Sequence, residues 1–272
     1  IATTLLLTPS YTNAVAGATT LNVAGGMSGF VGALAPELAM AGSEAQDNAN
    51  EEALGQMVGA GFEAPRLLEG LGREWQVTRN YFRLYACCNP IHPALDCLRA
   101  ALSELRPAPD EIERIEVATY RFASVMRNPD PPNFFASKYS LPHAAAVLAV
   151  RGALDHAALD DSALADPAII ALRPRVHVSE DPAMSELAPR LRPARVTVTL
   201  TNGRQATHAC ESHRGDFNEP FDPAELRAKF HDLAGLVLGD GGIAYAESLC
   251  ADLENVADMR KAIAELGRHA RR

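Results

Sequence analysis

The chain has 272 residues, 47% of them hydrophobic, which is long and apolar enough to form one large or two modest domains. Its formal net charge of −9 argues against a nucleic-acid partner, because binding to phosphates needs a surplus of cations. Arginine makes up 22 of its 25 basic residues, which suits the capture of carboxylates, although genome composition explains the same bias more simply.

The N-terminal segment carries no charged side chain before Glu37. Pro9, Ser10 and Gly25 interrupt its apolar residues, which never reach the run of about 18 that a membrane span requires. No basic stretch precedes them as in a secretory signal. We therefore predict a buried helix and no membrane partner. Because Ile1 lies in what looks like the interior of a domain, we expect that an upstream portion is missing.

Small residues continue into a helical pattern over 33–41. Gly25, Gly29 and Gly32 are spaced so that two backbones can approach closely. The series lacks both the Gly-Lys-Ser/Thr ending of a phosphate loop and the strand-to-helix order of a dinucleotide site. We therefore expect no nucleotide cofactor.

The segment 82–96 carries the densest chemistry of the chain. It reads Phe-Arg-Leu-Tyr-Ala-Cys-Cys-Asn-Pro-Ile-His-Pro-Ala-Leu-Asp, so a fixed cation, two adjacent thiols and an imidazole precede an apolar pattern. A helix is predicted over 92–105, where leucines recur every three or four residues before two prolines. A strand over 112–117 and a buried helix over 141–154 follow.

Two further strands have the clearest pattern. Residues 195–200 alternate polar and apolar side chains, and Asn202-Gly203 is a two-residue hairpin signal before a partner strand at 205–210. A neighbouring strand is expected beside them at 175–178.

Helices flank this mixed region, which predicts the α+β class: an all-helical domain built from both ends of the chain with an inserted α+β unit. The boundaries assign residues 1–78 and 216–272 to the helical domain and 79–215 to the insertion. In the last part, the run Asp-Pro-Ala-Glu at 222–225 supplies an N-cap, a first-turn proline and a reciprocal acid.

Arg83 and His92 are the leading candidates for a functional site. An imidazole at a helix N-terminus tends to stay neutral, so His92 suits proton transfer, although a histidine there also serves simply to cap or pack the helix. Arg83 stands among aromatic residues, where a partly buried guanidinium needs an anion; a surface arginine is the plain alternative. His143 also begins a helix, so the two imidazoles can face one cleft.

The five cysteines are an odd, scattered set, which argues against a disulfide framework and predicts a reducing, cytoplasmic location. Adjacent cysteines rarely direct both sulfurs at one ion, and the chain has no second Cys-x-x-Cys pair, so we expect neither zinc nor an iron–sulfur cluster. Cys88 is either a nucleophile or, more commonly, a buried structural thiol.

A second cluster, Ser-Lys-Tyr-Ser-Leu-Pro-His at 137–143, directly precedes the next apolar helix. Lys138 is one of three lysines in the chain, and its plain alternative is a solvated residue before a helix. His156, His208 and His213 are interpreted as structural or surface residues.

These segments resemble the MmgE/PrpD family. The run from Phe82 to Asp96 looks like the family's basic-aromatic-Cys-x-x-x-His-Pro-x-x-Asp segment. Further agreement comes from Ala-Ser-Lys-Tyr-Ser-Leu-Pro at 136–142, from Gly203, and from 223–230, which resembles a Pro…Leu-x-x-Lys-Phe stretch. The resemblance covers roughly residues 62–233.

The resemblance implies an all-helical domain, an α+β lid with the active site in the cleft between them, and a homodimer. The family includes 2-methylcitrate dehydratase, cis-aconitate decarboxylase and iminodisuccinate epimerase, which act on small polycarboxylates without metal or nucleotide. Such chemistry needs a base for the proton next to a carboxylate, an acid for the departing group, and cations for the carboxylate oxygens.

By position, Arg83 matches a family lysine, Cys88 a Cys or His that lines the site, and His143 a position often held by tyrosine. We therefore expect a lyase-like enzyme that dehydrates, decarboxylates or epimerises a small di- or tricarboxylic acid, with no cofactor. The expected catalytic residues are His92 and His143. The expected substrate-binding residues are Arg83, Cys88, Lys138 and Ser140.

Departures from the family pattern favour an alternative. The family's Lys-x-x-His-x-Gly segment corresponds to 21–26, where Leu21 and Ala24 replace the lysine and histidine, and 43–61 looks like an insertion. The catalytic Asp and His residues of the family's upstream portion are not in this sequence. The alternative is a catalytically silent homologue that binds acids or forms a dimer interface. A redox protein that uses the adjacent cysteines is a third hypothesis.

Overall fold

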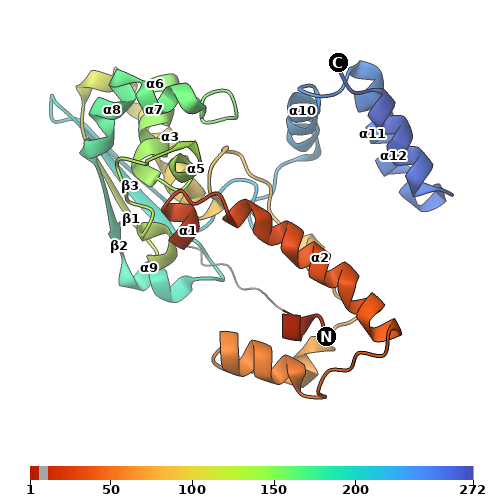
Figure 1. Ribbon diagram of the computed structural model, residues 1–272. Helices are drawn as coiled ribbons and strands as arrows, with labels where there is room; N and C mark the ends of the chain where they lie inside the picture. The colour runs from red at the N-terminus through yellow and green to blue at the C-terminus, as the bar shows by residue number, and fades with distance from the viewer. Residues whose placement is uncertain (6–11, 272) are drawn as a thin grey trace. The chain divides into compact units, whose positions relative to one another are not determined.

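The computed structural model describes residues 1–5 and 12–271, so the predicted interruption at Pro9 and Ser10 lies outside the described residues. The chain divides into two compact units, Ile1–Glu219 and Pro220–Arg272. Helices accompany a four-stranded mixed sheet, which is consistent with the α+β class (Figure 1). The arrangement of a helical domain with an inserted lid at 79–215 stays a prediction.

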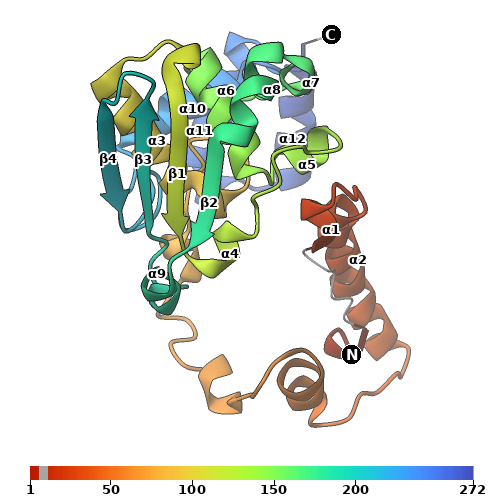
Figure 2. The same ribbon diagram turned by 90° about the vertical axis from the view of Figure 1, so that its left-hand side faces the viewer.

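The larger unit contains one sheet with the strand order β2-β1-β3-β4 (Figure 2). Its strands are β1 (Ile112–Thr119), β2 (Val176–Glu180), β3 (Ala194–Leu200) and β4 (Gln205–Cys210). β1 pairs with β2 in parallel and with β3 antiparallel, and β3 and β4 form the predicted hairpin. The strand expected at 175–178 forms as β2, but its position beside the hairpin is wrong, because it pairs with β1 at the opposite edge.

The alternating pattern of β1 and β3 decides which face of the sheet is covered. Val117, Val196 and Val198 share one face and are at most 2% exposed. Helices α3 (His92–Leu105) and α6 (Leu141–Arg151) lie on this side, as Figure 1 shows with the sheet near edge-on. Burial of one such aliphatic side chain contributes about 1.5–3 kcal/mol, so the pattern fixes the register and the covered face.

Local signals set the ends of the two core helices. α3 begins at His92 and is followed by Arg106, whose φ of 51° is left-handed, so the predicted helix over 92–105 is confirmed. α6 begins after Ser140, whose hydroxyl accepts a hydrogen bond from the His143 amide at 3.1 Å. α6 ends before the predicted limit at 154, because Gly152 adopts a left-handed φ of 72°.

Short helices connect the strands. They are α4 (Arg121–Ser124), α5 (Phe134–Ser137), α7 (Asp161–Ala165), α8 (Pro167–Leu172) and α9 (Pro182–Leu187). Short 3-10 helices occur at Thr3–Leu5, Ala64–Leu67, Gln76–Arg79, Asn89–Ile91, Pro109–Glu111, Arg173–Arg175 and Leu253–Asn255. The long crossover from β1 through α4–α8 allows β2 to lie parallel to β1.

The N-terminal segment is helical but exposed. α1 (Thr12–Val15) and α2 (Leu21–Met40) are followed by a π-helical segment at Glu51–Val58. No residue of α2 is buried, and a Cβ added at Gly25 or Gly32 would meet nothing within 4 Å. The prediction of a buried helix is therefore wrong, because the part of the chain that the structure describes leaves its apolar side chains open to solvent.

α2 is also the one described helix that is long and apolar enough to cross a membrane, judged by length and composition alone. It lies near the N-terminus. Core helices and signal sequences satisfy the same criterion, so the absence of a membrane partner stays a prediction.

The smaller unit contains α10 (Pro223–Ala234), α11 (Asp240–Ala251) and α12 (Met259–Arg268). Its predicted capping box is confirmed: the Glu225 amide donates to the Asp222 carboxylate at 2.8 Å, and the Asp222 amide donates to the Glu225 carboxylate at 3.0 Å. Glu247 of α11 accepts hydrogen bonds from Arg227 and His231 of α10, which lower the pKa of Glu247 to about 2. These contacts join α10 to α11.

Candidate active site

One cavity of about 430 Å³ is formed by the loop before α3, the start of α4, the end of α5 and the loop before β3. Its walls are Tyr81, Arg83, Cys88, Asn89, Pro90, Tyr120, Phe122, Tyr139, Ala188, Pro189 and Arg192. Two guanidinium groups and three phenol groups therefore line one space. A concave site with a few convergent polar groups suits a small anion.

Arg83 is a fixed cation at the cavity wall. The backbone of its loop is held by the Phe82 amide, which donates to the carbonyl of Gly215 at 2.8 Å. Partial burial acts to lower the pKa of Arg83, but a side-chain hydrogen bond to Tyr81 outweighs it, so the pKa is raised. The guanidinium is thus charged and directed by Tyr81.

The two sequence clusters meet at this cavity. The amide of Cys88 donates to the carbonyl of Lys138 at 2.8 Å. Tyr139 therefore lines the same cavity as Cys88. Burial raises the pKa of Tyr139 and the pKa of Tyr120, which lines the same cavity. Both phenols are therefore protonated at neutral pH.

A chain of hydrogen bonds runs from Arg192 into the protein. The guanidinium of Arg192 donates to Oδ1 of Asn89 at 2.6 Å, and Nδ2 of Asn89 donates to Nε2 of His213 at 2.6 Å. Nδ1 of His213 donates to the carbonyl of Arg214 at 2.9 Å. Because a guanidinium can only donate, this order fixes the orientation of the Asn89 amide and the proton of His213 on Nδ1.

His92 lies behind the cavity wall. It is fully buried and does not line the cavity. Its Nε2 donates to the carbonyl of Cys87 at 3.3 Å, and its ring packs edge to face against His213 and Tyr85, with centroid separations of 5.2 and 5.1 Å. His92 therefore contacts the network that holds Arg192, and its role in proton transfer stays a prediction.

His143 lies in a different environment. It is fully buried in α6, and neither of its ring nitrogens has a hydrogen-bond partner among the described residues. Burial, with the positive charges of Arg173 and Arg151, lowers the pKa of His143 to about 4. His143 does not line the cavity, so the structure does not bring it together with Arg83 there.

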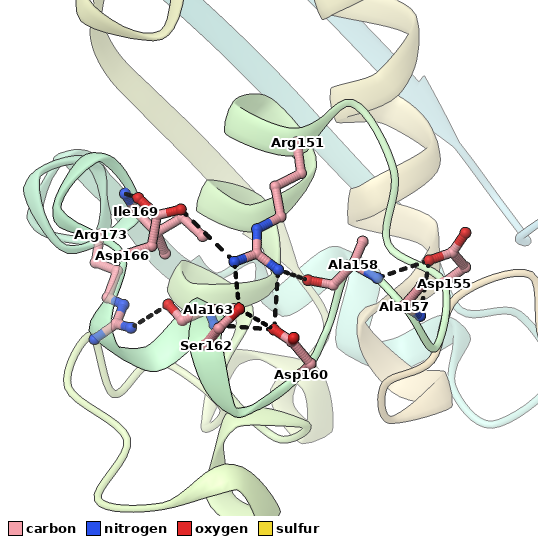
Figure 3. Close-up of polar contacts among 10 residues, drawn as sticks. All are labelled: Arg151, Asp155, Ala157, Ala158, Asp160, Ser162, Ala163, Asp166, Ile169 and Arg173. Carbon is pink, nitrogen blue, oxygen red and sulfur yellow. Dashed lines mark hydrogen bonds and ion pairs between the residues drawn. The ribbon is translucent and has the colours of Figure 1, made fainter.

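The two arginines near His143 join the helices of the crossover, as Figure 3 shows. Arg151 donates to the carbonyl of Ala158 at 2.8 Å and to the carboxylate of Asp160 at 3.0 Å. Arg173, only 4% exposed, donates to the carbonyl of Ala163 within α7, at 3.2 Å. These cations are committed to structural contacts.

The two remaining predicted binding residues make local contacts. Nζ of Lys138 lies 4.3 Å from the ring centroid of Phe134, which is a cation–π contact. The Ser140 hydroxyl donates to the carbonyl of Asn128 at 2.6 Å in addition to capping α6. Neither side chain lines the cavity, and their contact with a substrate stays a prediction.

Cys87, Cys88, Cys97, Cys210 and Cys250 form no disulfide bond within the described residues. Cys87 is fully buried, and burial raises the pKa of its thiol well above the ordinary value, which makes it a poor nucleophile and argues against the redox hypothesis. Cys97 of α3 and Cys210 of β4 place their sulfurs 3.5 Å apart. Within residues 1–5 and 12–271, no three His, Cys, Asp or Glu side chains group so as to hold a metal ion.

Arg192, Asn89 and His213 were not singled out by the sequence. Arg192 is one of 22 arginines and stands in no motif. The interpretation of His213 as structural or surface is confirmed in its first form, because its side chain is fully buried and holds Asn89 of the cavity wall. The sequence offered one weak signal for His213, which is that Gly215 follows two residues later and marks a turn after β4. The structure confirms this turn, with a φ of 94° at Gly215.

Comparison with known proteins gives one finding for this region. A family model described as the MmgE/PrpD C-terminal domain matches residues 85–250, which is more than half of the chain. No curated protein matches the sequence. The matched range includes Cys88, Asn89 and Arg192 but stops short of Tyr81 and Arg83.

Proposed function

The chain belongs to the MmgE/PrpD family, and from this premise we propose that it is a lyase-like enzyme acting on a small di- or tricarboxylic acid. The reaction removes water or a carboxyl group next to a carboxylate, or epimerises the carbon there. One observation carries the proposal: Arg83 and Cys88, the positions that resemble the family's binding residues, line one cavity together with three phenols.

Arg83 is the proposed carboxylate clamp. Abstraction of a proton next to a carboxylate builds negative charge on the carboxylate oxygens, and a guanidinium stabilises this charge with two parallel hydrogen bonds. The bond between Arg83 and Tyr81 supports the role, because it orients the cation before a ligand binds. Less reorganisation is then needed during the reaction.

The departing group needs a proton donor, and the proton next to the carboxylate needs an acceptor. Tyr139 and Tyr120 are the candidate donors, because both phenols line the cavity and carry a proton at neutral pH. His92 is the proposed acceptor because it stands at the position that resembles the family's His-Pro histidine, and its ring packs against His213 behind the cavity wall. His143, with a pKa of about 4, is a much weaker base at neutral pH and is therefore the less suited of the two.

Proton NMR of the purified chain with 2-methylcitrate, citrate, cis-aconitate and iminodisuccinate tests the proposal. We expect turnover of at least one acid. Arg83→Ala should raise the KM by about 10- to 100-fold, because a hydrogen bond to a charged group contributes about 1.5–3 kcal/mol. Arg83→Lys keeps the cation but not the planar fork, and should recover part of this loss.

Arg79→Ala is the matched control, because Arg79 is exposed in the 3-10 helix just before this loop and does not line the cavity. Its KM and melting temperature should equal those of the unchanged chain. If Arg83→Ala leaves the turnover of every acid unaffected, Arg83 is not the clamp. Binding of these acids without any turnover would support the silent homologue that Leu21 and Ala24 suggest.

A further inference from the structure

Arg192 is the second guanidinium of the cavity, and the mechanism above leaves it without a role. It precedes β3, and its amide donates to the carbonyl of Glu211 at 2.9 Å. The backbone of Arg192 is therefore tied to the chain that follows β4, while its side chain reaches the loop before α3.

Three contacts hold the guanidinium of Arg192 in place. It donates to Asn89 at 2.6 Å, lies 3.8 Å from the carboxylate of Asp216, and stacks over the ring of Tyr81, 5.4 Å from the centroid. Its side chain is still 30% exposed, and it lines the cavity. A cation held in this way loses little conformational freedom when an anion binds.

The charges of the cavity favour a ligand with more than one negative group. The lining residues include Arg83 and Arg192 but no aspartate or glutamate. Asp216 stands behind the wall, 5% exposed, and offsets part of the charge of Arg192 without entering the cavity. Two cations at one cavity offer separate partners for two carboxylates.

The hydrogen bonds from Arg192 through Asn89 to His213 allow one consistent placement of their hydrogens. If the Asn89 amide turned over, its NH₂ group would face the guanidinium, and neither group could accept. His213 prevents this, because its Nε2 needs a donor while Nδ1–H is committed to the carbonyl of Arg214. The buried pair Asn89 and His213 therefore holds the acceptor toward Arg192.

We propose that Arg192 is a specificity-determining residue that binds a second carboxylate of the substrate, and that Asn89 and His213 are its positioning residues. The inference rests on the proposed function, in which Arg83 binds the first carboxylate. Within the proposed class of di- and tricarboxylic acids, Arg192 binds the carboxylate that Arg83 does not, and a monocarboxylate binds without using Arg192.

Ligand-observed NMR titration of the full chain separates binding from turnover. The probes are tricarballylate, which has three carboxylates and no hydroxyl to eliminate, and butyrate, which has one carboxylate. Arg192→Gln should weaken tricarballylate binding by about 10- to 100-fold and butyrate binding by less than about twofold. Arg190→Gln, an exposed arginine on the same loop, is the matched control and should bind both acids as the unchanged chain does.

The outcomes separate this inference from the proposed function. Equal weakening of both acids, no weakening of tricarballylate, or no binding of tricarballylate by the unchanged chain would overturn the role of Arg192. Binding that follows the expected pattern without turnover of any acid would overturn the lyase assignment and leave the role of Arg192 standing.

A double-variant cycle tests the positioning residues. Asn89→Leu should weaken tricarballylate binding, and the double variant with Arg192→Gln should bind no more weakly than Arg192→Gln alone, because Asn89 acts through Arg192. His213→Gln, which keeps an acceptor for Asn89, should stay within about twofold, whereas His213→Leu should not. Additive losses, or equal losses for the two His213 variants, would overturn the positioning role, and melting temperatures verify that each variant folds.

Discussion

The start of α3 and the start of α6 each bury a histidine, but the two regions surround it with different groups. At α3, His92 donates to the carbonyl of Cys87 and packs against the rings of His213 and Tyr85, next to the cavity wall. At α6, the ring of His143 has no hydrogen-bond partner among the described residues, and the positive charges of Arg173 and Arg151 disfavour its protonation. A histidine's position on a helix therefore does not by itself set its chemistry.

Magnitudes show which effect dominates at α6. The charge of a helix N-terminus contributes about 0.3–1 kcal/mol to a nearby ionised group. The pKa of His143, about 4, corresponds to roughly 3 kcal/mol against its charged form. Burial and the two arginines therefore affect the charged form of His143 more than the N-terminus of α6 does. Substitutions in the α6 region and at the cavity test this contrast with His92.

The largest expected effect comes from removing a cation of the α6 region. Arg173→Ala leaves the carbonyls of Ala163 and Leu164 without their donor, so we expect a loss of about 3–5 kcal/mol in the free energy of unfolding. Urea denaturation measures it. Arg127→Ala, an exposed arginine, should change stability by no more than about 0.5 kcal/mol. A loss below about 1 kcal/mol for Arg173→Ala would mean that this arginine does not hold the crossover.

The pH dependence of stability isolates His143. The folded chain keeps His143 neutral down to a pKa of about 4, whereas the unfolded chain protonates it near pH 6.5. The unfolded state thus binds more protons between these values, and stability falls as the pH falls. His143→Leu should reduce the loss between pH 7 and 4.5 by about 2.5 kcal/mol in urea titrations. If the unchanged chain and His143→Leu lose the same stability between pH 7 and 4.5, the low pKa of His143 is wrong.

On the cavity side, Tyr139→Phe removes the phenol hydroxyl and keeps the aromatic ring. We expect kcat to fall by about 100-fold with the substrate that the NMR screen identifies, while the free energy of unfolding changes by less than about 1 kcal/mol. Tyr245→Phe, which loses a phenol in the smaller unit, is the control and should keep kcat. An unchanged kcat in Tyr139→Phe would leave Tyr120 as the proposed donor.

The smallest effect is expected at the cap between the two regions. Ser140→Ala removes the cap of α6 and the bond to the carbonyl of Asn128, which should cost about 1–2 kcal/mol of stability. Its KM should stay unchanged, and Ser140→Thr should restore most of the stability. A tenfold rise in KM for Ser140→Ala would instead support the substrate contact predicted from the sequence.

Much of the fold could be predicted because its signals are local. Asn202-Gly203 forms the hairpin turn with a left-handed Gly203, and Ser140 and Gly152 bound α6 within their own turns. The partner of β2 could not be predicted, since it depends on the path of a long crossover. The exposure of α2 could not be predicted either, because composition does not say which residues come to cover a helix.

The candidate site divides in the same way. Arg83, Cys88 and His92 were found because they stand within one dense segment of the sequence. Arg192 and His213 join that segment from more than a hundred residues away, through contacts with Asn89. No local pattern marks such a pair, because each of its hydrogen bonds is formed only when distant segments meet.

The amino-acid sequence by itself determined the β3–β4 hairpin, the helices α3 and α6, the family and the candidate cation Arg83. Each depends on neighbours within a few residues or on a run of side chains in a fixed order. Only the tertiary structure decided that His143 is a weak base, that His92 lies behind the wall of the cavity, and that Arg192 lines the same cavity as Arg83. Protonation and ligand contacts depend on desolvation and nearby charges, and folding brings those together from the whole chain.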